Sequence, residues 1–263
     1  MEADVLYVLP WVVGLLRYVV LAGLPFLVVY LWWPKVFANS KIQARPASRK
    51  DFVREVVYSV QSNFVLVAVA VAVLQPPFRG YTQVYSQLGA YPWWWVPVSI
   101  VLALVLHDTY FYWLHRLVHH PRLYRRVHLV HHQSSNPSPL AAYAFHFTEA
   151  LLEALVLPII LLVLPMHLLA LFLFATLAFA LHVYGHLGHA VAPRWLRHSV
   201  LFGVVTTSVH HNMHHAQGSC NYGLYFRFWD RAMGTEHPGY VAAYDAIQHK
   251  RFATGAISEH SKA

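Results

Sequence analysis

The sequence predicts an all-α integral membrane protein with about four transmembrane passes, including a short helical hairpin, and a histidine-rich helical cytosolic cap. Three observations predict this fold. Of the 263 residues, 57% are hydrophobic and only 11% are charged, whereas a soluble domain carries roughly a quarter charged residues. The apolar residues gather in four long regions. The basic residues gather on one side of the membrane that these regions imply.

The first three apolar regions cover residues 5–33, 56–75 and 92–114. The first follows the start MEADVLYVLP, where Glu2 and Asp4 stand at positions that are positively charged in a secretory signal, so we expect a retained membrane anchor. The second ends at Pro76-Pro77, which cannot continue a helix. The third opens with the tryptophan cluster YPWWWVP, a composition typical of the membrane–water interface.

The fourth apolar region, residues 150–186, decides the topology. As one straight helix it would run about 55 Å, far beyond a hydrocarbon core of about 30 Å. A break near Leu164-Pro165-Met166-His167 divides it into two arms of roughly 16 residues, each about 24 Å long. We therefore expect a hairpin that enters the bilayer and returns. Its two ends, and the histidines beside them, then lie on the same side.

The distribution of Lys and Arg supports this topology. With the N-terminus outside, the inside segments are 34–55, 115–149 and everything after 186, and they hold 17 of the 19 Lys and Arg residues. This asymmetry follows the positive-inside rule and explains the net charge of +8 without a nucleic-acid partner. A single cysteine, Cys220, excludes an intramolecular disulfide and a cysteine-held iron–sulfur cluster.

Seventeen of the twenty histidines lie between positions 107 and 215. Most of them form four spaced sets, all on the inside face in this topology. On a helix, residues three or four positions apart share one face, so their imidazoles can point at one metal ion. The four sets are HRLVH with His115 and His119, HLVHH with His128, His131 and His132, HVYGH with His182 and His186, and HNMHH with His211, His214 and His215.

A metal centre competes here with a simpler interpretation. A single histidine pair on a helix is more often a hydrogen-bonded polar pair than a pair of ligands, and an exposed histidine tract can be a titrating membrane surface. Four sets that converge at one face favour ligation. Neutral imidazole suits iron, zinc, copper and nickel, and ten imidazoles suit two ions, as in a dinuclear redox centre. No HExxH motif is present, which disfavours a zinc metalloprotease.

The motifs also carry a family resemblance. The stretch DTYFYWLHRLVHHPRLYRRVHLVHHQSSNPSPLAAYAFHFTEA, followed by HHNMHH and NYGLYFRFWDRAMGT, resembles the fatty acid hydroxylase/sterol desaturase superfamily. The tail NYG…F…WDR…GT resembles its sterol desaturase branch. The resemblance covers roughly residues 100–236. It implies three regions: N-terminal transmembrane helices with a basic loop in 1–99, a catalytic domain in 100–240, and a C-terminal tail in 241–263.

The resemblance implies an O2-dependent, non-haem di-iron enzyme that hydroxylates or desaturates a C–H bond of a sterol-like or fatty-acyl or alkyl lipid. The cofactors would be two iron ions, which zinc could replace in purified protein. The ligands carried over from the family pattern are His115, His119, His128, His131, His132, His211, His214 and His215. His182 and His186 resemble an additional ligand pair of the fatty acid hydroxylases, and His189 lies one turn further on.

Five other residues are candidates for contacts behind the ligands or in the substrate cavity. Asp108 and Tyr112 share a helical stripe with His115 and His119, so Asp108 could line the cavity or form an interhelical hydrogen bond. His146 matches a recurrent family histidine and could donate to a ligand. Glu149 could hold a ligand imidazole or stabilise a helix N-terminus, together with Glu153. Asp230 could pair with an arginine or accept from a ligand imidazole.

Two further histidines are expected to lie outside the metal site: His107 is expected to pack, and His210 has no ligand spacing. The chain shows no flavin, haem or ferredoxin motif, so the electrons would come from an external donor such as a reductase, a ferredoxin or a cytochrome-type carrier. The C-terminal ISEHSKA lacks an endoplasmic reticulum retrieval signal. This favours a bacterial inner membrane, with the endoplasmic reticulum as the eukaryotic alternative.

Two other functional classes remain open at this point. A histidine-rich membrane metal-binding or transport protein would have its ligands strung across the bilayer. A metal-dependent lipid hydrolase would need an open metal site but neither O2 nor electrons. Hydroxylation and desaturation also remain equal alternatives, and the oligomeric state is left open.

Overall fold

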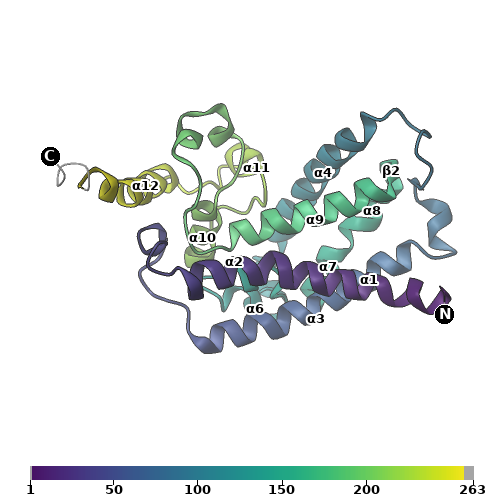
Figure 1. Cartoon of the computed structure of the whole chain (residues 1–263), viewed down its shortest axis with the longest axis horizontal. Coiled ribbons are helices and arrows are strands. Elements are labelled where there is room, and N and C mark those ends of the chain that lie inside the picture. The colour runs from purple at the N-terminus through teal and green to yellow at the C-terminus, as the bar shows by residue number, and fades with distance from the viewer. Residues whose placement is uncertain (1, 258–263) are drawn as a thin grey trace.

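A computed structural model describes residues 2–257 and the side-chain surroundings of residues 8–253. The chain is almost wholly helical, and its long helices lie alongside one another with the C-terminal helices gathered at one end (Figure 1). Four helices in the described part are long and apolar enough to cross a membrane: Val8–Trp32, Arg49–Val73, Trp95–Val118 and Leu168–Gly185. The predicted all-α membrane fold is confirmed.

The first span is built from α1 (Glu2–Tyr18) and α2 (Leu24–Phe26), joined and followed by π-helical segments at Val19–Gly23 and Leu27–Trp32. It packs along α3 (Arg49–Val73). Val8, Leu9 and Leu16 each leave about half of their surface exposed. Such a continuous apolar face on a helix is explained by contact with lipid rather than water.

Helix α3 begins seven residues before the predicted start of the second apolar region. The side chain of Ser48 accepts a hydrogen bond from the N–H of Asp51, whose carboxylate accepts from the N–H of Ser48. This capping box satisfies two free donors of the first turn and fixes the start of the helix. The basic residues Arg49, Lys50 and Arg54 therefore lie on α3 and not in the preceding loop.

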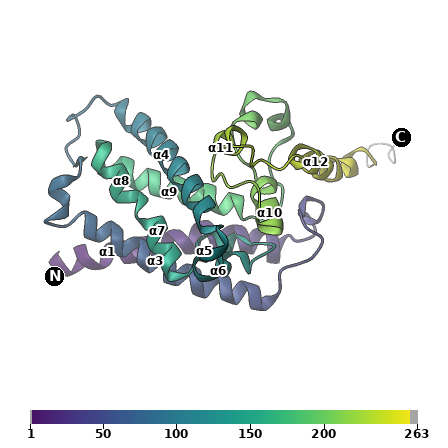
Figure 2. The same cartoon turned by 180° about the vertical axis from the view of Figure 1, so that it is seen from behind.

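Helix α4 (Trp95–Val118) extends past the predicted end at 114, so that His115 lies in its last turn. His119 terminates the helix, and two short helices follow, α5 (Pro121–Val127) and α6 (Leu129–His132). The imidazole of His120 accepts a hydrogen bond from the N–H of Arg122 and caps α5. The sharp turn between α4 and α5 brings α6 back toward the end of α4 (Figure 2).

The predicted hairpin is present, with its break at the predicted position. Its first arm is two short helices, α7 (Phe147–Ala154) and α8 (Val156–Val163), and its second is α9 (Leu168–Gly185). At the tip, β2 (Met166–His167) pairs in parallel with β1 (Val84–Tyr85), and the indole N–H of Trp95 donates to the Pro165 carbonyl. Because the arms return to the same end, residues near 146 and 186 lie together.

The cap consists of α10 (Ser208–Gln217), α11 (Phe228–Ala232) and α12 (Tyr240–Ile257). Its own small core contains Phe202, Val209, Tyr240 and Tyr244. These side chains hold α12 against α10, which carries the last histidine set. Of the segment ISEHSKA, residues 258–263 lie outside the described part of the chain.

Candidate metal centre

The structure gathers nine of the ten predicted ligands into two groups of imidazoles. Within each group, the ligand nitrogens all lie within 4.8 Å of one another. We name these the first and the second histidine group. The first contains His115, His119, His128, His132 and His214, and the second contains His131, His186, His211 and His215.

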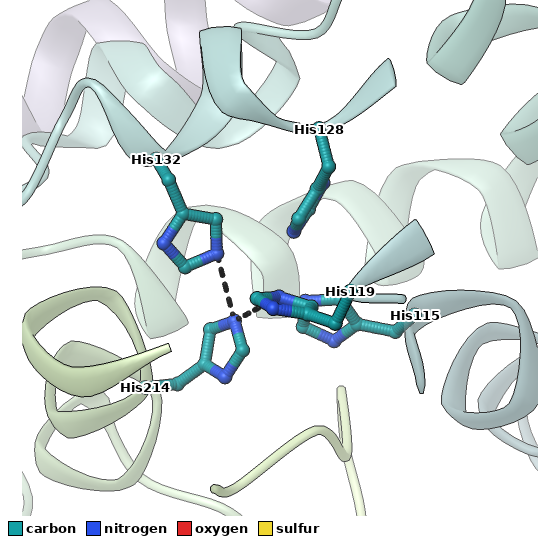
Figure 3. Close-up of side chains that lie close together, drawn as sticks. All are labelled: His115, His119, His128, His132 and His214. Atoms are coloured by element: carbon teal, nitrogen blue, oxygen red, sulfur yellow. Dashed lines mark hydrogen bonds between the residues drawn. The ribbon is translucent and has the colours of Figure 1, made fainter. Parts of the chain in front are cut away.

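The first group is assembled from three segments. His115 and His119 come from the end of α4, His128 directly precedes α6 and His132 is its last residue, and His214 comes from α10 (Figure 3). The five side chains point toward a common centre in this view. The i, i+4 spacings in the sequence therefore supply pairs, and the fold supplies the convergence of these pairs.

The nitrogen–nitrogen distances fit ligands of a single ion. In the first group, Nε2 of His214 lies 3.1 Å from Nε2 of His119 and 3.0 Å from Nε2 of His132. Metal–nitrogen bonds of about 2.1 Å place two ligands at a right angle about 3 Å apart. Nδ1 of His214 lies 2.6 Å from the Cys220 carbonyl, which can only accept, so Nδ1 carries the proton and Nε2 presents a lone pair.

Two more members of the first group are oriented in the same way. Nδ1 of His115 donates to the carbonyl of Tyr222 at 2.8 Å, and Nδ1 of His128 donates to Glu149 at 2.6 Å. The Nε2 atoms of both histidines are buried and have no hydrogen-bond partner among the described residues. A buried nitrogen without a partner costs about 1–3 kcal/mol unless something binds it, and a metal ion would do so.

The second group also has closely spaced Nε2 atoms, and a different backbone carbonyl orients one of its rings. Nδ1 of His186, at the end of α9, donates to the carbonyl of His182 at 2.9 Å. Its Nε2 lies 3.2 Å from Nε2 of His131, 3.0 Å from that of His211 and 3.2 Å from that of His215. One lone pair cannot satisfy three neighbouring donors, so convergence on an ion explains these contacts better than hydrogen bonding does.

The two groups are adjacent and share their supporting elements. His131 and His132 are neighbours on α6 but belong to different groups, and so do His214 and His215 on α10. The rings of His132 and His215 stack with centroids 4.9 Å apart. Two ions held here would lie side by side behind a common wall of imidazoles, as a dinuclear centre requires.

Burial keeps these imidazoles neutral. It lowers the pKa of His119 to about 3, with a further contribution from His214. Burial also lowers the pKa values of His214 and His186 to about 4. The neutral imidazole is the form that binds a metal, so the metal-free groups are ready to accept cations at neutral pH.

Several histidines lie outside both groups. The ring of His182 lies 4.8 Å from that of His186, but its Nε2 is buried without a partner among the described residues. His189 packs against Tyr30 instead. His107 contacts the hydroxyl of Tyr225, and His210 packs edge-on against Tyr240. The expectation that His107 and His210 lie outside the site agrees with these positions.

Asp108 and Asp230 hold the loop that follows α10. Asp230 accepts from the N–H groups of Tyr222 and Gly223, and from the hydroxyl of Thr235. Asp108 accepts from three successive N–H groups, those of residues 224, 225 and 226. Among the described residues, Asp230 pairs with no arginine and with no histidine of either group; the imidazole nearest to it is that of His210, whose Nε2 lies 3.6 Å from its carboxylate. Asp230 orients His115 indirectly: it holds the backbone of Tyr222, and the carbonyl of Tyr222 accepts the hydrogen bond from Nδ1 of His115.

The other three predicted supporting residues have distinct positions. Glu149 contacts His128, as described, which is one of the two alternatives considered for it. Tyr112 is fully buried and its hydroxyl lies 3.0 Å from that of Thr235. His146 contacts no ligand: its imidazole accepts from the N–H of Thr148 and caps α7. The expectation that His146 donates to a ligand is therefore wrong.

The backbone acceptors in this loop could not be predicted from the sequence. The carbonyls of Cys220 and Tyr222 orient His214 and His115, and carbonyls leave no mark in a sequence. The one sequence feature that marks this loop is the tripeptide NYG at residues 221–223. A Cβ at Gly223 would lie 2.4 Å from the carbonyl oxygen of Phe226, so this loop conformation requires glycine.

An apolar cavity of about 330 Å³ adjoins the second group. Its walls come mainly from α3, α8 and α9, and His182 lies among its lining residues together with Glu153 and Arg17. This volume is in the range of small-molecule sites, which are mostly apolar with a few polar groups. A lipid in this cavity would be separated from the second histidine group by the side chain of His182, whose ring lies 4.8 Å from that of His186.

This fold and site define a class: helical membrane proteins with paired, buried histidine groups. The sequence matches the fatty acid hydroxylase family over residues 100–235. A Delta(7)-sterol 5(6)-desaturase of Gibberella zeae is 29% identical over 223 residues, which cover 83% of this chain and 64% of that protein. The lathosterol oxidase of Mus musculus is 32% identical over 206 residues, 77% of this chain and 67% of that protein.

The human lathosterol oxidase is 30% identical over 212 residues, 79% of this chain and 69% of that protein. No solved structure matches the chain. The chain belongs to the fatty acid hydroxylase family, in its sterol desaturase-like branch, and is an integral membrane protein. It spans 64% to 69% of the length of these three relatives.

Proposed function

We propose that this protein is an O2-dependent di-iron oxygenase that hydroxylates or desaturates a C–H bond of a membrane lipid, with sterols as the leading substrate class. The observation that carries the proposal is the pair of adjacent, buried histidine groups with converging nitrogens. The printed activities of the relatives, sterol desaturation and lathosterol oxidation, support the substrate class.

The predicted ligand histidines would hold two metal ions. Each group would bind one iron ion, with His182 as a further candidate ligand beside the second. Bound iron supplies the redox chemistry that activates O2 toward an unreactive C–H bond. The protein fixes the ring orientations through the Tyr222, Cys220 and His182 carbonyls and through Glu149. Such outer contacts keep each imidazole in the ligating tautomer.

The apolar cavity would position the substrate. A lipid entering between the helices would leave water behind and place one carbon near His182 and the second group. Fixing a single C–H bond at the site favours reaction there over the many equivalent bonds of the lipid. Electrons would come from a separate reductase, ferredoxin or cytochrome-type carrier that docks at the cap.

The charge distribution supports a cytoplasmic location of the histidine groups, because 17 of the 19 Lys and Arg residues fall on that side. The membrane would be a bacterial inner membrane, or the endoplasmic reticulum in a eukaryote. Metal transport is the weaker alternative, because the groups include the histidines at the ends of the spanning helices α4 and α9 and are not strung along them.

Mass spectrometry of the lipids of a host with and without the gene tests this function. The expected result is a lipid that gains one oxygen atom or loses two hydrogens, only in air and only with the unmodified chain. The control host expresses the His214→Ala variant, which should give no product. Zinc-only protein that releases lipid fragments without O2 would identify a hydrolase instead and would overturn the proposal.

A further inference from the structure

Exposed apolar side chains gather at one edge of the cap, where the 3₁₀ turns η6 (Arg194–His198) and η7 (Val200–Gly203) meet α11. The guanidinium of Arg231 on α11 donates to the carbonyl of Gly203, which holds α11 against η7. Val200 alone leaves 87% of its surface exposed. Exposed apolar patches on a folded protein mark surfaces that bind a partner or a membrane. We name this surface the apolar edge, and it consists of Trp195, Val200, Leu201, Val204 and Phe228.

The apolar edge adjoins a membrane-spanning helix. The indole N–H of Trp229 on α11 donates to the hydroxyl of Thr109 on α4 at 3.1 Å, and its ring packs edge-on against that of Trp113. Thr109 lies about 14 Å before Val118, the last residue of α4, along the helix axis. Figures 1 and 2 both show α11 beside α4. Helix α11 is therefore at the depth of the last turns of α4, and not beyond its end.

The exposed apolar surface of α4 continues toward this edge. On α4, the side chains of Val105, Trp113 and Leu117 leave 45% to 56% of their surface exposed. Such side chains on a spanning helix face lipid, and tryptophan is enriched at the level of the headgroups. Since Trp113 contacts Trp229, the lipid that covers α4 also reaches α11. The bilayer can thus cover α4 and the apolar edge as one continuous surface.

Unpaired cationic side chains border the apolar edge. Arg194 directly precedes Trp195, and Arg231 lies on α11, three residues after Phe228. Both arginines are exposed, and neither forms an ion pair within the described part of the chain. Apolar and aromatic side chains beside Lys or Arg are the combination by which interfacial segments bind membranes with acidic lipids.

A hollow of about 640 Å³ between η6 and α12 adds to this positive charge. Of its described lining residues, only Asp245 is acidic, and Arg197 pairs with it at 2.7 Å. The charge that remains favours an anion such as a phosphate group. The basic side chains of the lining are Arg194, Arg197, His198, His249 and Lys250.

We propose that the apolar edge is seated in the headgroup layer of the leaflet at which α4 ends, where its arginines bind the phosphates of acidic phospholipids. The apolar side chains reach below the headgroups, while Arg194 and Arg231 lie at the level of the phosphates. The bilayer then holds the cap directly, in addition to the connections that the spanning helices provide. This inference is independent of the proposed function, because it requires neither a metal ion nor a substrate.

Charge and depth favour the bilayer over other occupants. A second copy of this chain would bring the same unpaired arginines to the contact, and like charges repel. An acidic soluble protein could pair with Arg194, but it could not cover side chains that adjoin the lipid-facing surface of α4. A bilayer with acidic lipids supplies both the apolar depth and the negative charge.

A fluorescent label tests this contact in the full chain in lipid nanodiscs. The label is attached to Val200→Cys in a Cys220→Ala background, which lacks the one native cysteine. A nitroxide near the headgroup end of the acyl chains quenches a label that lies in lipid, and iodide quenches a label in water. The matched control is Ala246→Cys, an exposed position on α12, which extends away from the spanning helices (Figure 1).

We expect the lipid nitroxide to quench the label at position 200 about threefold or more strongly than the label at position 246. Iodide should quench the two labels in the reverse order. If Val200→Cys does not fold, Val204→Cys reports on the same edge, because Val204 is also exposed. Equal quenching of both positions by iodide would overturn the inference. Protection of position 200 from both quenchers would show that protein covers the edge, and would overturn it too.

The lipid composition tests the role of the arginines. The nanodiscs contain either phosphatidylcholine alone or equal parts of phosphatidylcholine and phosphatidylglycerol. The ratio of lipid-quenched to unquenched label at position 200 should rise with phosphatidylglycerol, by about fivefold for each arginine that binds. The double variant Arg194→Gln/Arg231→Gln should lose this rise.

The matched control for the charge is Arg125→Gln/Arg126→Gln, which removes two exposed charges from α5. This variant should keep the full response to phosphatidylglycerol. Quenching that does not depend on phosphatidylglycerol in the unmodified edge would overturn the inference. An equal loss of the response in both double variants would overturn it as well, because the effect would then come from the total charge of the chain.

Discussion

The carboxylate of Glu149 accepts a hydrogen bond of 2.6 Å from Nδ1 of His128, and both side chains are 2% exposed. Glu149 lies on the first arm of the hairpin, whereas His128 lies between α5 and α6. This bond therefore connects the membrane hairpin to the first histidine group. Burial, with a further contribution from Glu153, raises the pKa of Glu149 well above its usual value. A cation bound at the first group would favour the ionised carboxylate, whose charge would in turn favour that cation.

Replacing Glu149 by glutamine should weaken metal binding. The variant keeps the shape and the acceptor oxygen but removes the charge, so we expect about a tenfold loss of affinity at the first group. Competition with a chelator during iron loading measures this loss. The control is Asp245→Asn, which removes an ion pair with Arg197 that is about one-third exposed and contains no member of either histidine group. Equal losses in both variants would contradict a specific role for Glu149.

Replacing Asp230 by alanine should destabilise the whole cap. The variant leaves the N–H groups of Tyr222 and Gly223 and the hydroxyl of Thr235 without their acceptor. We expect a loss of about 3–5 kcal/mol in the free energy of unfolding. Thermal unfolding followed by circular dichroism measures it. A loss below about 0.5 kcal/mol, as at an ordinary surface position, would show that this loop is held by other contacts.

Gly223→Ala should also be severely destabilising. The new methyl group would lie 2.4 Å from the carbonyl oxygen of Phe226 and 2.9 Å from the carboxylate of Asp230, so the loop must shift. Gly80→Ala is the matched control, because a Cβ there meets nothing within 4 Å. We expect a loss of about 3 kcal/mol or more for the first and within about 0.5 kcal/mol for the second. Expression level and thermal unfolding measure both.

The metal-free protein should lose stability in mild acid. Burial lowers the pKa of His119 to about 3 and those of His214 and His186 to about 4, from an ordinary value of 6.5. Below pH 6.5 the unfolded chain therefore binds more protons than the folded chain, so stability falls as the pH falls.

The expected loss is about 1.5 kcal/mol for each such histidine between pH 6.5 and pH 5. Thermal unfolding of chelator-treated protein over this range measures it. Bound metal should make the stability less dependent on pH, down to the pH at which protons displace the ion from the imidazoles. A melting temperature that stays constant from pH 6.5 to pH 5 would contradict the burial of neutral imidazoles.

Much of the fold followed from the sequence because membrane insertion imposes simple rules. The length of the fourth apolar region and its break at Pro165 were enough to predict a hairpin, and the hairpin predicted that the histidine sets meet. Helix ends were predicted less well. The start of α3 depends on hydrogen bonds of Ser48 and Asp51 that hydropathy does not reflect. The interruption of the first arm at Leu155 lies just before Pro158, which has no N–H to donate to the carbonyl of Ala154, and hydropathy does not reflect this either.

The sequence predicted that the ligands of the candidate site are histidines, but not which histidine belongs to which of the two groups. From their spacing, His128, His131 and His132 form one set. In the structure, His131 belongs to the second group, and His128 and His132 belong to the first. Spacing also could not place His182, which lies next to the second group and faces the cavity. Asp108 and Asp230 act on the backbone of one loop, and such long-range contacts have no local signature.

The partition of the histidines leads to the most direct test of the account. His128 and His131 lie three residues apart but belong to different groups. Iron bound per chain should be measured, after anaerobic loading, for the unmodified protein and for the variants His128→Ala and His131→Ala. We expect about two ions for the unmodified chain and about one for each variant. One ion in the unmodified chain, or no change in either variant, would contradict a di-iron centre built from these two groups.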